Sequence, residues 1–414
     1  MSSYSNSLLL TSVIALPSLA ALLLYFGAWR RSAFEERALL QLPKAGLAND
    51  GSQHLVVILP ARNEALGIEA TLNALLQDQA SELAVYVFDD ESDDDTAAIV
   101  TRISAGDSRL HLLQPKDVPS MDAPEACFGK PWAQQRALYF VWKARGHRDD
   151  NVLFLDADVV LEPDVLGGVL SYFDENKLDA LSGNPRMKTH SLVEELFIPA
   201  FVSLVASQYA PSKINAADSA DKSQVSFLNG QFILVRGAVL DEVQGWSKVL
   251  GTVLEDVAFA KMLSKNNKKT GFADLRPIAS TQMYSSWSEI RQGFGKNAVA
   301  LFGGPFRTSF LAFVAATLSL APWSSVVAAF LTLLFPPGFS SELLHPFALF
   351  LGCFLSWGAI LFLQAKVRRR MGHAAWPVFF LPAVYVGVAF VLVEASCKKM
   401  IGGRILWKGR SYQA

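Results

Sequence analysis

The sequence predicts an α/β domain built on a doubly wound sheet and joined to transmembrane α-helices. Between residues 50 and 280, short apolar runs alternate with segments of helical spacing, which is typical of βαβ units. Charge-free apolar stretches lie on either side of that region, and the first of them is long enough to cross a bilayer. In addition, Asp156 and Asp158 directly follow one of the short apolar runs, at the sheet edge where such folds bind ligands.

Length and composition indicate the domain organisation. The 414 residues suffice for one domain of about 250 residues plus membrane segments. Hydrophobic residues make up 51% of the chain, and the excess lies in four stretches: Leu8–Trp29, Phe310–Phe335, Phe347–Leu363 and Trp376–Val393. We therefore expect a membrane-anchored domain rather than a transporter. Its parts in order are an N-terminal transmembrane anchor (1–30), the α/β domain (50–280), an interfacial amphipathic segment (281–308), C-terminal membrane-associated helices (309–396) and a basic tail (397–414).

The charges around the first apolar stretch predict an uncleaved anchor and its orientation. No Lys or Arg precedes the stretch, although a signal peptide would have one, whereas Arg30, Arg31 and Arg37 follow it. The positive-inside rule then places the N-terminus outside and the central domain in the cytoplasm. We expect a multi-pass protein of the cell (inner or plasma) membrane.

The C-terminal apolar stretches leave two topologies open. Basic clusters lie within 366–370 and 398–410, and the positive-inside rule expects both of them inside. One spanning helix between the clusters would put them on opposite sides. Either Trp376–Val393, which contains Pro377 and Pro382, is re-entrant or interfacial, or all four stretches span the membrane and one basic cluster lies outside.

Net charge and cysteine content argue against two classes of protein. A net charge of −1 disfavours a nucleic-acid binder, which normally has a basic face, so we expect no nucleic-acid partner. Cys127, Cys353 and Cys397 are too few and too widely spaced for a disulfide framework or a zinc site. This agrees with a reducing, cytoplasmic environment.

The first half of the domain has three expected strands. Leu55–Leu59 is a continuous apolar run closed by Pro60, and a helix follows over Ile68–Gln79, where apolar residues recur at helical spacing. The second strand, Ala84–Phe88, ends in Asp89 and Asp90, whose carboxylates would face a nucleotide base or ribose. The acidic residues 93–95 then favour the start of a helix over 96–103, and a short strand is expected at 110–113.

The strand Val152–Leu155 runs directly into Asp156-Ala157-Asp158. Because the run is apolar throughout, we expect a buried strand of a parallel sheet, with both carboxylates at its carboxyl end. Two carboxylates one residue apart form a hard oxygen site, which suits Mg²⁺ or Mn²⁺ together with a bound phosphate.

Three further segments carry polar groups. Gly129-Lys130 opens an expected helix, where a lysine can neutralise phosphate, although the second glycine and the Ser/Thr of a P-loop are missing. Asn229–Arg236 is expected to form a turn and a strand. Glu255 and Asp256 precede an apolar helix, where they are either catalytic or only stabilise the helix N-terminus.

Taken in order, five of these motifs resemble a family 2 glycosyltransferase of the GT-A fold, a Rossmann-like nucleotide-diphospho-sugar transferase: Pro60–Glu64, Phe88–Thr96, Asp156–Asp158, Asn229–Gln231 and Glu255-Asp256. The resemblance implies an inverting transfer of a hexose from a nucleotide-diphospho-sugar donor, with Mg²⁺ or Mn²⁺ as cofactor. It implies that Asp256 is the general base and that Asp158 and Asp156 bind the metal. It implies a donor nucleotide site formed by Pro60, Ala61, Glu64, Asp90, Lys130 and Asp156.

The segments after the domain narrow the resemblance. Met283–Trp287 and Gly293–Asn297 look like the post-catalytic segment of bacterial lipid and carotenoid glycosyltransferases, and Trp407–Tyr412 is similar to their C-terminal signature. The Gln/Arg-x-x-Arg-Trp signature of ceramide and hopanoid enzymes is absent, since the chain has Ser285-Ser286-Trp287 there. The resemblance therefore implies a carotenoid or other lipid acceptor in the bilayer, with contacts from Gln231, Glu255, Trp287, Arg291 and Lys296.

Helical spacing of Trp287, Ile290 and Phe294, beside Arg291 and Lys296, predicts a helix. It either lies in the membrane interface and guides the acceptor, or packs on the globular domain.

Other classes remain as alternatives. A ceramide- or hopanoid-type lipid glycosyltransferase shares the architecture. A nucleotidyl or phosphosugar transferase would normally have a Gly-rich basic loop after the first strand, where this chain has Ala61–Glu64. A polysaccharide synthase would need more than four apolar stretches to build a channel, and a non-enzymatic scaffold would tolerate loss of the aspartates, all of which are present.

Overall fold

The computed structural model describes residues 2–43, 54–78, 82–118, 129–145, 150–216, 227–252, 254–335, 344–407 and 410–413. The chain divides into two compact units. The α/β unit contains Ala38–Lys188 and Tyr209–Met283, and the helical unit contains Met1–Arg37, Thr189–Gln208 and Tyr284–Ala414.

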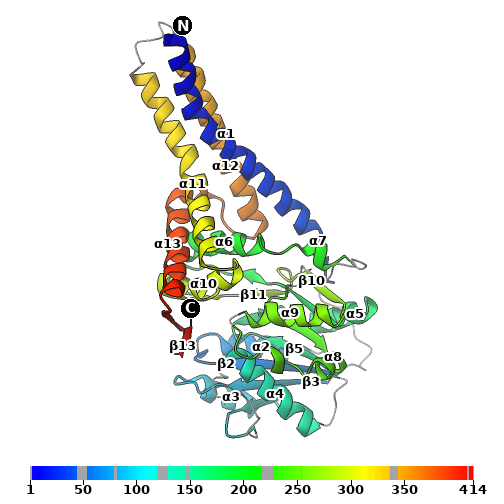
Figure 1. The fold of residues 1–414 in the computed structure, drawn as a ribbon. Coiled ribbons are helices and arrows are strands. Elements are labelled where there is room, and N and C mark those ends of the chain that lie inside the picture. Colours follow the sequence, from blue (N-terminus) through cyan, green and yellow to red (C-terminus); the bar gives the residue numbers. More distant parts are fainter. Residues whose placement is uncertain are drawn as a thin grey trace. The chain divides into compact units, whose positions relative to one another are not determined.

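The α/β unit is organised around an eight-stranded sheet of order β1-β10-β7-β9-β5-β2-β3-β4 (Figure 1). Its strands are β1 (Leu40–Gln41), β2 (Leu55–Ala61), β3 (Leu83–Asp89), β4 (Leu110–Leu113), β5 (Asn151–Leu155), β7 (Ala180–Asn184), β9 (Phe232–Arg236) and β10 (Thr270–Asp274). All neighbours are parallel except β9, which runs antiparallel to both β5 and β7. The expected parallel sheet is therefore mixed, because one strand is inserted in the opposite direction beside β5.

A second sheet has three strands, β6 (Val159–Leu161), β11 (Ala279–Thr281) and β8 (Arg186–Met187), in the order β6-β11-β8. Because β5 belongs to the large sheet and β6 to the small one, the turn Asp156–Asp158 lies where the chain passes from one sheet to the other.

Helices cover both faces of the large sheet. One core contains apolar residues of α2 (Ile68–Gln77), α3 (Thr96–Ser104) and α5 (Leu166–Glu175). The other core contains α4 (Lys130–Arg145), α8 (Gly237–Val243) and α9 (Glu255–Lys265). Alternate residues of β2 enter the two cores, with Val57 in the first and Val56 in the second, as the two-residue period of a strand requires. The short helices α7 (Pro211–Ile214) and η2 (Ser247–Val249) complete this unit.

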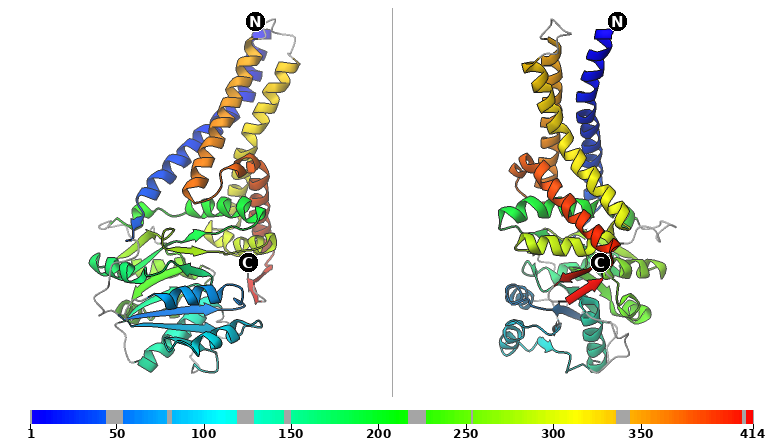
Figure 2. Two further views of the ribbon diagram at one scale, coloured as in Figure 1. Left: turned by 180° about the vertical axis from the view of Figure 1, so that it is seen from behind. Right: turned by 60° about the vertical axis from the view of Figure 1, so that its left-hand side comes forward.

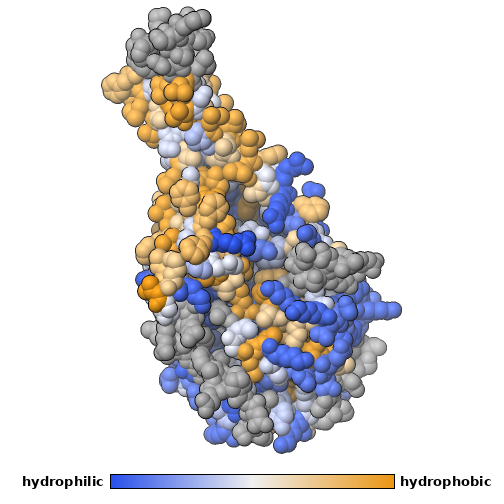
Figure 3. Space-filling view, viewed as in Figure 1, coloured by the Kyte–Doolittle hydropathy of each residue, from blue (hydrophilic) through white to orange (hydrophobic). Residues whose placement is uncertain are grey.

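The helical unit contains α1 (Ser2–Arg37), α6 (Leu192–Ala206), α10 (Trp287–Leu301), α11 (Pro305–Leu334), α12 (Leu344–Arg370), η3 (Trp376–Phe380) and α13 (Leu381–Met400), followed by a hairpin of β12 (Arg404–Trp407) and β13 (Arg410–Gln413). Among the described residues, four helical segments are long and apolar enough to cross a membrane: Leu9–Arg37, Pro305–Leu334, Pro346–Arg370 and Trp376–Met400. They correspond to the four apolar stretches of the sequence. Hydrophobic residues are exposed along the bundle, as Figure 3 shows.

Within the helical unit, α6, α10 and α13 pack on one another. The rings of Phe197 and Trp287 are 4.5 Å apart, and those of Phe201 and Phe294 stack at 4.3 Å. Ile290 is fully buried. The apolar side of α10 therefore packs against α6 within the helical unit, a contact that neither sequence-based interpretation of this helix anticipated.

Candidate active site

Three adjacent parallel strands end at the same edge of the large sheet. In the β2–β3 ladder Ala61 lies opposite Asp89, and in the β2–β5 ladder Ile58 lies opposite Phe154. The segments that follow β2, β3 and β5 therefore meet at one edge, as the sequence predicted. This edge holds Pro60, Ala61, Glu64, Asp90, Asp156 and Asp158.

Backbone contacts join the segments after β2 and β3. Asp90 N–H donates to Ala61 O over 2.8 Å, and Arg62 Nη1 donates to Asp90 O over 2.6 Å. Glu64 N–H donates to Thr96 Oγ1 over 2.9 Å. These contacts fix the two segments against each other, and Asp90 is only 8% exposed.

The neighbouring Asp89 has a different surrounding. Its Oδ1 accepts the N–H of Ser92 over 3.1 Å, and its Oδ2 accepts Gln114 Nε2 over 3.0 Å. The side chain is buried, at 2% exposure, so Asp89 stabilises the loop after β3 through these two hydrogen bonds.

Arg136 of α4, which no sequence motif singled out, adds a cation to this side of the site. Its guanidinium lies 5.3 Å from the centre of the Phe88 ring and donates from Nη2 to Pro115 O over 2.5 Å. Burial lowers the pKa of Arg136, and the negative charge of Asp90 opposes that shift. The only sequence signal was its place on the helix that Lys130 opens.

The turn Asp156–Asp158 is held by backbone contacts. Asp156 N–H donates to Gln231 O over 3.1 Å, and Val159 N–H donates to Asp156 O over 3.1 Å. Thr71 Oγ1 of α2 donates to Ala157 O over 2.9 Å. The turn is therefore fixed from both sides before any ligand contributes.

Lys130, the first residue of α4, joins this turn to the turn before β9. Its Nζ lies 2.5 Å from Asp156 Oδ1 and donates to Gly230 O over 2.7 Å. Burial disfavours its charged form, but the negative charges of Asp156, Glu255 and Asp256 outweigh burial and raise the pKa of Lys130. The ammonium is therefore charged at neutral pH.

Asp256 lies in the first turn of α9 and is oriented by two backbone groups. Its Oδ2 accepts Gly230 N–H over 3.1 Å, and its Oδ1 accepts Val257 N–H over 2.8 Å. Burial raises the pKa of the Asp256 carboxyl, although Lys130 and the two N–H groups oppose the shift. Asp256 thus accepts a hydrogen bond from the N-terminus of α9, as expected if it only stabilises that helix. It also bonds Gly230, the residue that Lys130 contacts.

Gly230 stands between the lysine and this aspartate. A Cβ at position 230 would lie 3.0 Å from Lys130 Nζ and 3.2 Å from Asp256 Oδ2. These contacts are tighter than usual, so a side chain here would require the Lys130 ammonium or the Asp256 carboxylate to shift by a few tenths of an ångström.

Asn229 and Gln231 stabilise the same turn. Asn229 Nδ2 lies 3.2 Å from Gln231 Oε1 and 3.1 Å from Asn184 Oδ1. Gln231 is only 6% exposed. Its contact with an acceptor remains a prediction.

The acidic groups suit a divalent cation. Among the residues that the structure describes, no group of three or more His, Cys, Asp or Glu side chains is arranged to hold a metal. Mg²⁺, however, commonly takes only one or two carboxylates and completes its shell with phosphate and water oxygens. Asp156 and Asp158 provide two carboxylates, and carboxylates outnumber the single ammonium of Lys130. The residues present therefore fit Mg²⁺ or Mn²⁺.

The three remaining candidates, Trp287, Arg291 and Lys296, belong to α10 of the helical unit. Arg291 Nε donates to Glu394 Oε2 over 2.6 Å, and its Nη2 donates to the other oxygen. This guanidinium is thus held by α13, which the sequence did not reveal.

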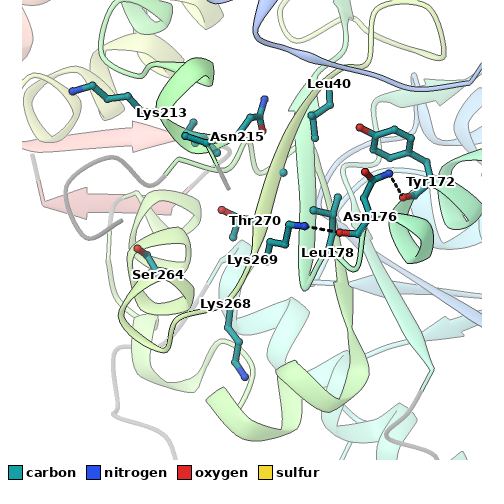
Figure 4. A pocket seen from close by; sticks show the side chains of 13 residues that line it. Leu40, Tyr172, Asn176, Leu178, Lys213, Asn215, Ser264, Lys268, Lys269 and Thr270 are labelled. Atoms are coloured by element: carbon teal, nitrogen blue, oxygen red, sulfur yellow. Dashed lines mark hydrogen bonds between the residues drawn. The ribbon is translucent and has the colours of Figure 1, made fainter. Parts of the chain in front are cut away.

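A separate cavity of about 200 Å³ lies at the β1–β10 edge of the α/β unit. Figure 4 shows Lys269 donating to Asn176 O, a bond of 2.8 Å. The neighbouring Lys268 pairs with Glu242. None of the predicted site residues lines this cavity.

Comparison with known proteins gives one family and several distant structures. Residues 52–294 match the model of the family described as glycosyltransferase like family 2. Mannosyltransferase PcManGT from Pyrobaculum calidifontis, solved with GDP-Man and Mn²⁺, is 17% identical, with a TM-score of 0.48 and coverage of 94% of this chain and 99% of its own. TarS 1–349 of S. aureus, solved with UDP-GlcNAc, is 16% identical, with a TM-score of 0.38 and coverage of 87% and 97%. Glucosyl-3-phosphoglycerate synthase from Mycobacterium tuberculosis, solved with Mn²⁺, UDP and glucosyl-3-phosphoglycerate, is 15% identical, with a TM-score of 0.35 and coverage of 66% and 85%. No curated protein matches the chain.

Proposed function

The chain belongs to glycosyltransferase family 2, and from this premise we propose that it transfers a hexose, with inversion, to a lipid-like acceptor in the bilayer. The fold is the expected GT-A type of α/β domain, accompanied among the described residues by four helical segments long and apolar enough to cross a membrane, and the enzyme uses a nucleotide sugar. The observation that carries the proposal is the cluster in which Lys130 contacts Asp156 and Gly230, while Gly230 contacts Asp256. We propose a carotenoid or related isoprenoid lipid as acceptor.

The donor would lie along the ends of β2, β3 and β5. Pro60, Ala61 and Glu64, with Asp90, would hold the nucleoside, since the contacts between their segments form a rigid edge. The charged Lys130 would face the diphosphate.

Asp158, with Asp156, would hold Mg²⁺ or Mn²⁺ against the diphosphate. When bound, the ion would act as a Lewis acid that stabilises the negative charge developing on the leaving nucleoside diphosphate. Hydrogen bonds to the backbone of the turn fix the position of the loop that carries both carboxylates.

Asp256 would take the proton from the acceptor hydroxyl as that oxygen attacks the anomeric carbon. Two N–H groups fix its carboxylate, and burial raises its pKa, which brings a carboxylate closer to the range useful for a base at neutral pH.

The membrane-spanning candidates support an acceptor that is dissolved in lipid. We propose that the protein is a multi-pass protein of the cell membrane, with the α/β unit in the cytoplasm, because Arg30, Arg31 and Arg37 follow the first span.

The test of the proposed function is nucleotide release by the purified full-length enzyme. Candidate sugar nucleotides are supplied with and without a lipid extract that contains carotenoids. We expect release to rise at least tenfold with the extract and the sugar to partition into the organic phase. Sugar recovered instead as a water-soluble polymer would favour a polysaccharide synthase, and a ceramide or hopanoid product would favour that lipid class.

Removal of divalent metal is expected to weaken donor binding by about tenfold or more, equivalent to about 1.4 kcal/mol, and to abolish transfer. Calorimetry of sugar-nucleotide binding with Mn²⁺, with Mg²⁺ and with a chelator measures this effect. Asp158→Asn should reproduce the effect of the chelator even with excess metal. Equal donor affinity and continued synthesis in the chelator would contradict the assigned role of Asp156 and Asp158.

A further inference from the structure

The segment Trp376–Met400, formed by η3 and α13, is long and apolar enough to cross a membrane. We infer that it does not cross, but lies in the membrane interface on the same side as the α/β unit. The chain then crosses the bilayer three times, through α1, α11 and α12. This inference concerns topology and holds whichever acceptor the enzyme uses.

The start of this segment is tied to α6 through Glu195. Glu195 Oε1 accepts Arg368 Nη2 over 2.8 Å and Ala374 N–H over 2.9 Å, and its Oε2 lies 3.2 Å from His373 Nδ1. The side chains of Glu195, Arg368 and His373 are 15%, 8% and 2% exposed. The turn from α12 to η3 is therefore fixed on α6.

Chain connectivity places helix α6 on the same side of the membrane as the α/β unit. The chain leaves that unit at Lys188, forms the 15 residues of α6, and returns to it at Tyr209. Such a helix is about 22 Å long, which is shorter than the ~30 Å hydrocarbon core, and a single crossing would leave the chain on the wrong side for its return. The start of η3 is therefore on that side as well.

The end of α13 is tied to α10. Arg291 forms a two-bond pair with Glu394, whose Oε1 also lies 2.9 Å from Lys398 Nζ. Helix α10 begins just after the α/β unit ends at Met283 and before the span α11 begins at Pro305. The turn before η3 and the last turns of α13 thus both contact helices on the same side of the membrane.

The middle of α13 also rests on these helices. A Cβ at Gly387 would lie 2.5 Å from Phe197 of α6, and one at Gly295 of α10 would lie 3.8 Å from Val391. In Figures 1 and 2, α13 runs beside the part of α11 nearest α6 and α10, whereas α1, α11 and α12 continue beyond it.

One face of α13 is left for the lipid interface. Val386, Phe390 and Val393 follow at helical spacing and are 47%, 56% and 42% exposed. The lysines Lys398 and Lys399 lie in the last turn. This exposed apolar face can enter the apolar side of the interface while the two lysines reach the lipid headgroups.

Three crossings also bring the basic residues of the helical unit into agreement with the positive-inside rule. With α13 in the interface, the basic residues after α1, at the end of α12 and after α13 all lie on the side of the α/β unit. Four crossings would place those after α13 on the opposite side, against the positive-inside rule. The interfacial alternative of the sequence analysis is therefore the one we infer.

The test is cysteine labelling of the full-length protein in cells, with the native cysteines replaced by serine. Single cysteines are introduced by Lys265→Cys in the α/β unit, Phe335→Cys at the end of α11 and Gln413→Cys at the C-terminus. In intact cells an impermeant maleimide should label position 335 only. Positions 265 and 413 should be labelled only after the membrane is permeabilised. Labelling of position 413 together with position 335 would overturn the inference.

A depth measurement gives a second, independent result. A spin label at Phe390→Cys in reconstituted vesicles is expected at headgroup depth, whereas one at Ala316→Cys in α11 is expected within the hydrocarbon. A label at position 390 that is as deep as the α11 label would overturn the inference. Neither measurement depends on transferase activity, so failure here is distinct from failure of the proposed function.

Discussion

Replacing Asp256 by asparagine is expected to lower kcat by about 10²–10⁴-fold while donor affinity stays within about twofold. Asparagine retains the shape and one acceptor oxygen for the N–H of Gly230 or Val257, which Asp256 now bonds. It cannot accept a proton, so the loss falls on the chemical step. Steady-state kinetics for transfer and calorimetry for donor binding separate the two effects.

The matched control is Glu255→Gln, one residue earlier in the first turn of α9. Because Glu255 is expected to contribute charge but not proton transfer, its loss should lower kcat by less than about tenfold. The opposite order of effects would assign the base to Glu255. Mild effects of both variants, together with a base-labile product, would indicate a carboxylate acceptor and a glycosyl ester.

Replacing Glu195 by glutamine is expected to destabilise the helical unit by about 3 kcal/mol or more, because breaking a buried ion pair leaves the remaining charge uncompensated. Arg368 is only 8% exposed, and Glu195 is the acidic partner of both Arg368 and His373. A lower unfolding temperature of the detergent-solubilised protein measures the effect.

An exposed ion pair provides the control. Glu162 and Arg186 are 3.6 Å apart, with side chains 50% and 47% exposed, so Glu162→Gln should cost less than about 1 kcal/mol. If Glu195→Gln and Glu162→Gln unfold at the same temperature, the cluster around Glu195 does not anchor η3 to α6.

Local pattern sufficed for most elements of the α/β unit. The helix expected over Ile68–Gln79 is α2, Ile68–Gln77, and the strand expected over Ala84–Phe88 is β3, Leu83–Asp89. These predictions succeed because burial of one face imposes a sequence period that can be read directly. The direction of β9 could not be predicted, because its apolar run fits either orientation and the pairing with β5 and β7 decides.

The sequence indicated which residues to expect in the candidate site, but it did not indicate which hydrogen bonds join them. Strand ends and the family resemblance pointed to Asp156, Asp256 and Lys130. Their connection through Gly230, however, depends on segments 26 and 100 residues apart in the sequence. The untested roles of these residues remain predictions.

The membrane part was predictable in composition only. Hydropathy identified the apolar stretch at Trp376–Met400, but length and apolar composition alone do not establish that a helix crosses the membrane. What separates them are ion pairs between residues far apart in sequence, such as Arg291 and Glu394, which are 103 residues apart. No local pattern contains that information.

Gly230 uses both of its backbone polar groups: its carbonyl accepts from Lys130 and its amide donates to Asp256. Turning this residue to strengthen one bond would disturb the other. If Lys130 and Asp256 have the roles proposed above, departure of the nucleotide and activation of the acceptor would be mechanically linked at this residue. Mutations in this turn should therefore slow both halves of the catalytic cycle together, and improving either half alone would require changes elsewhere.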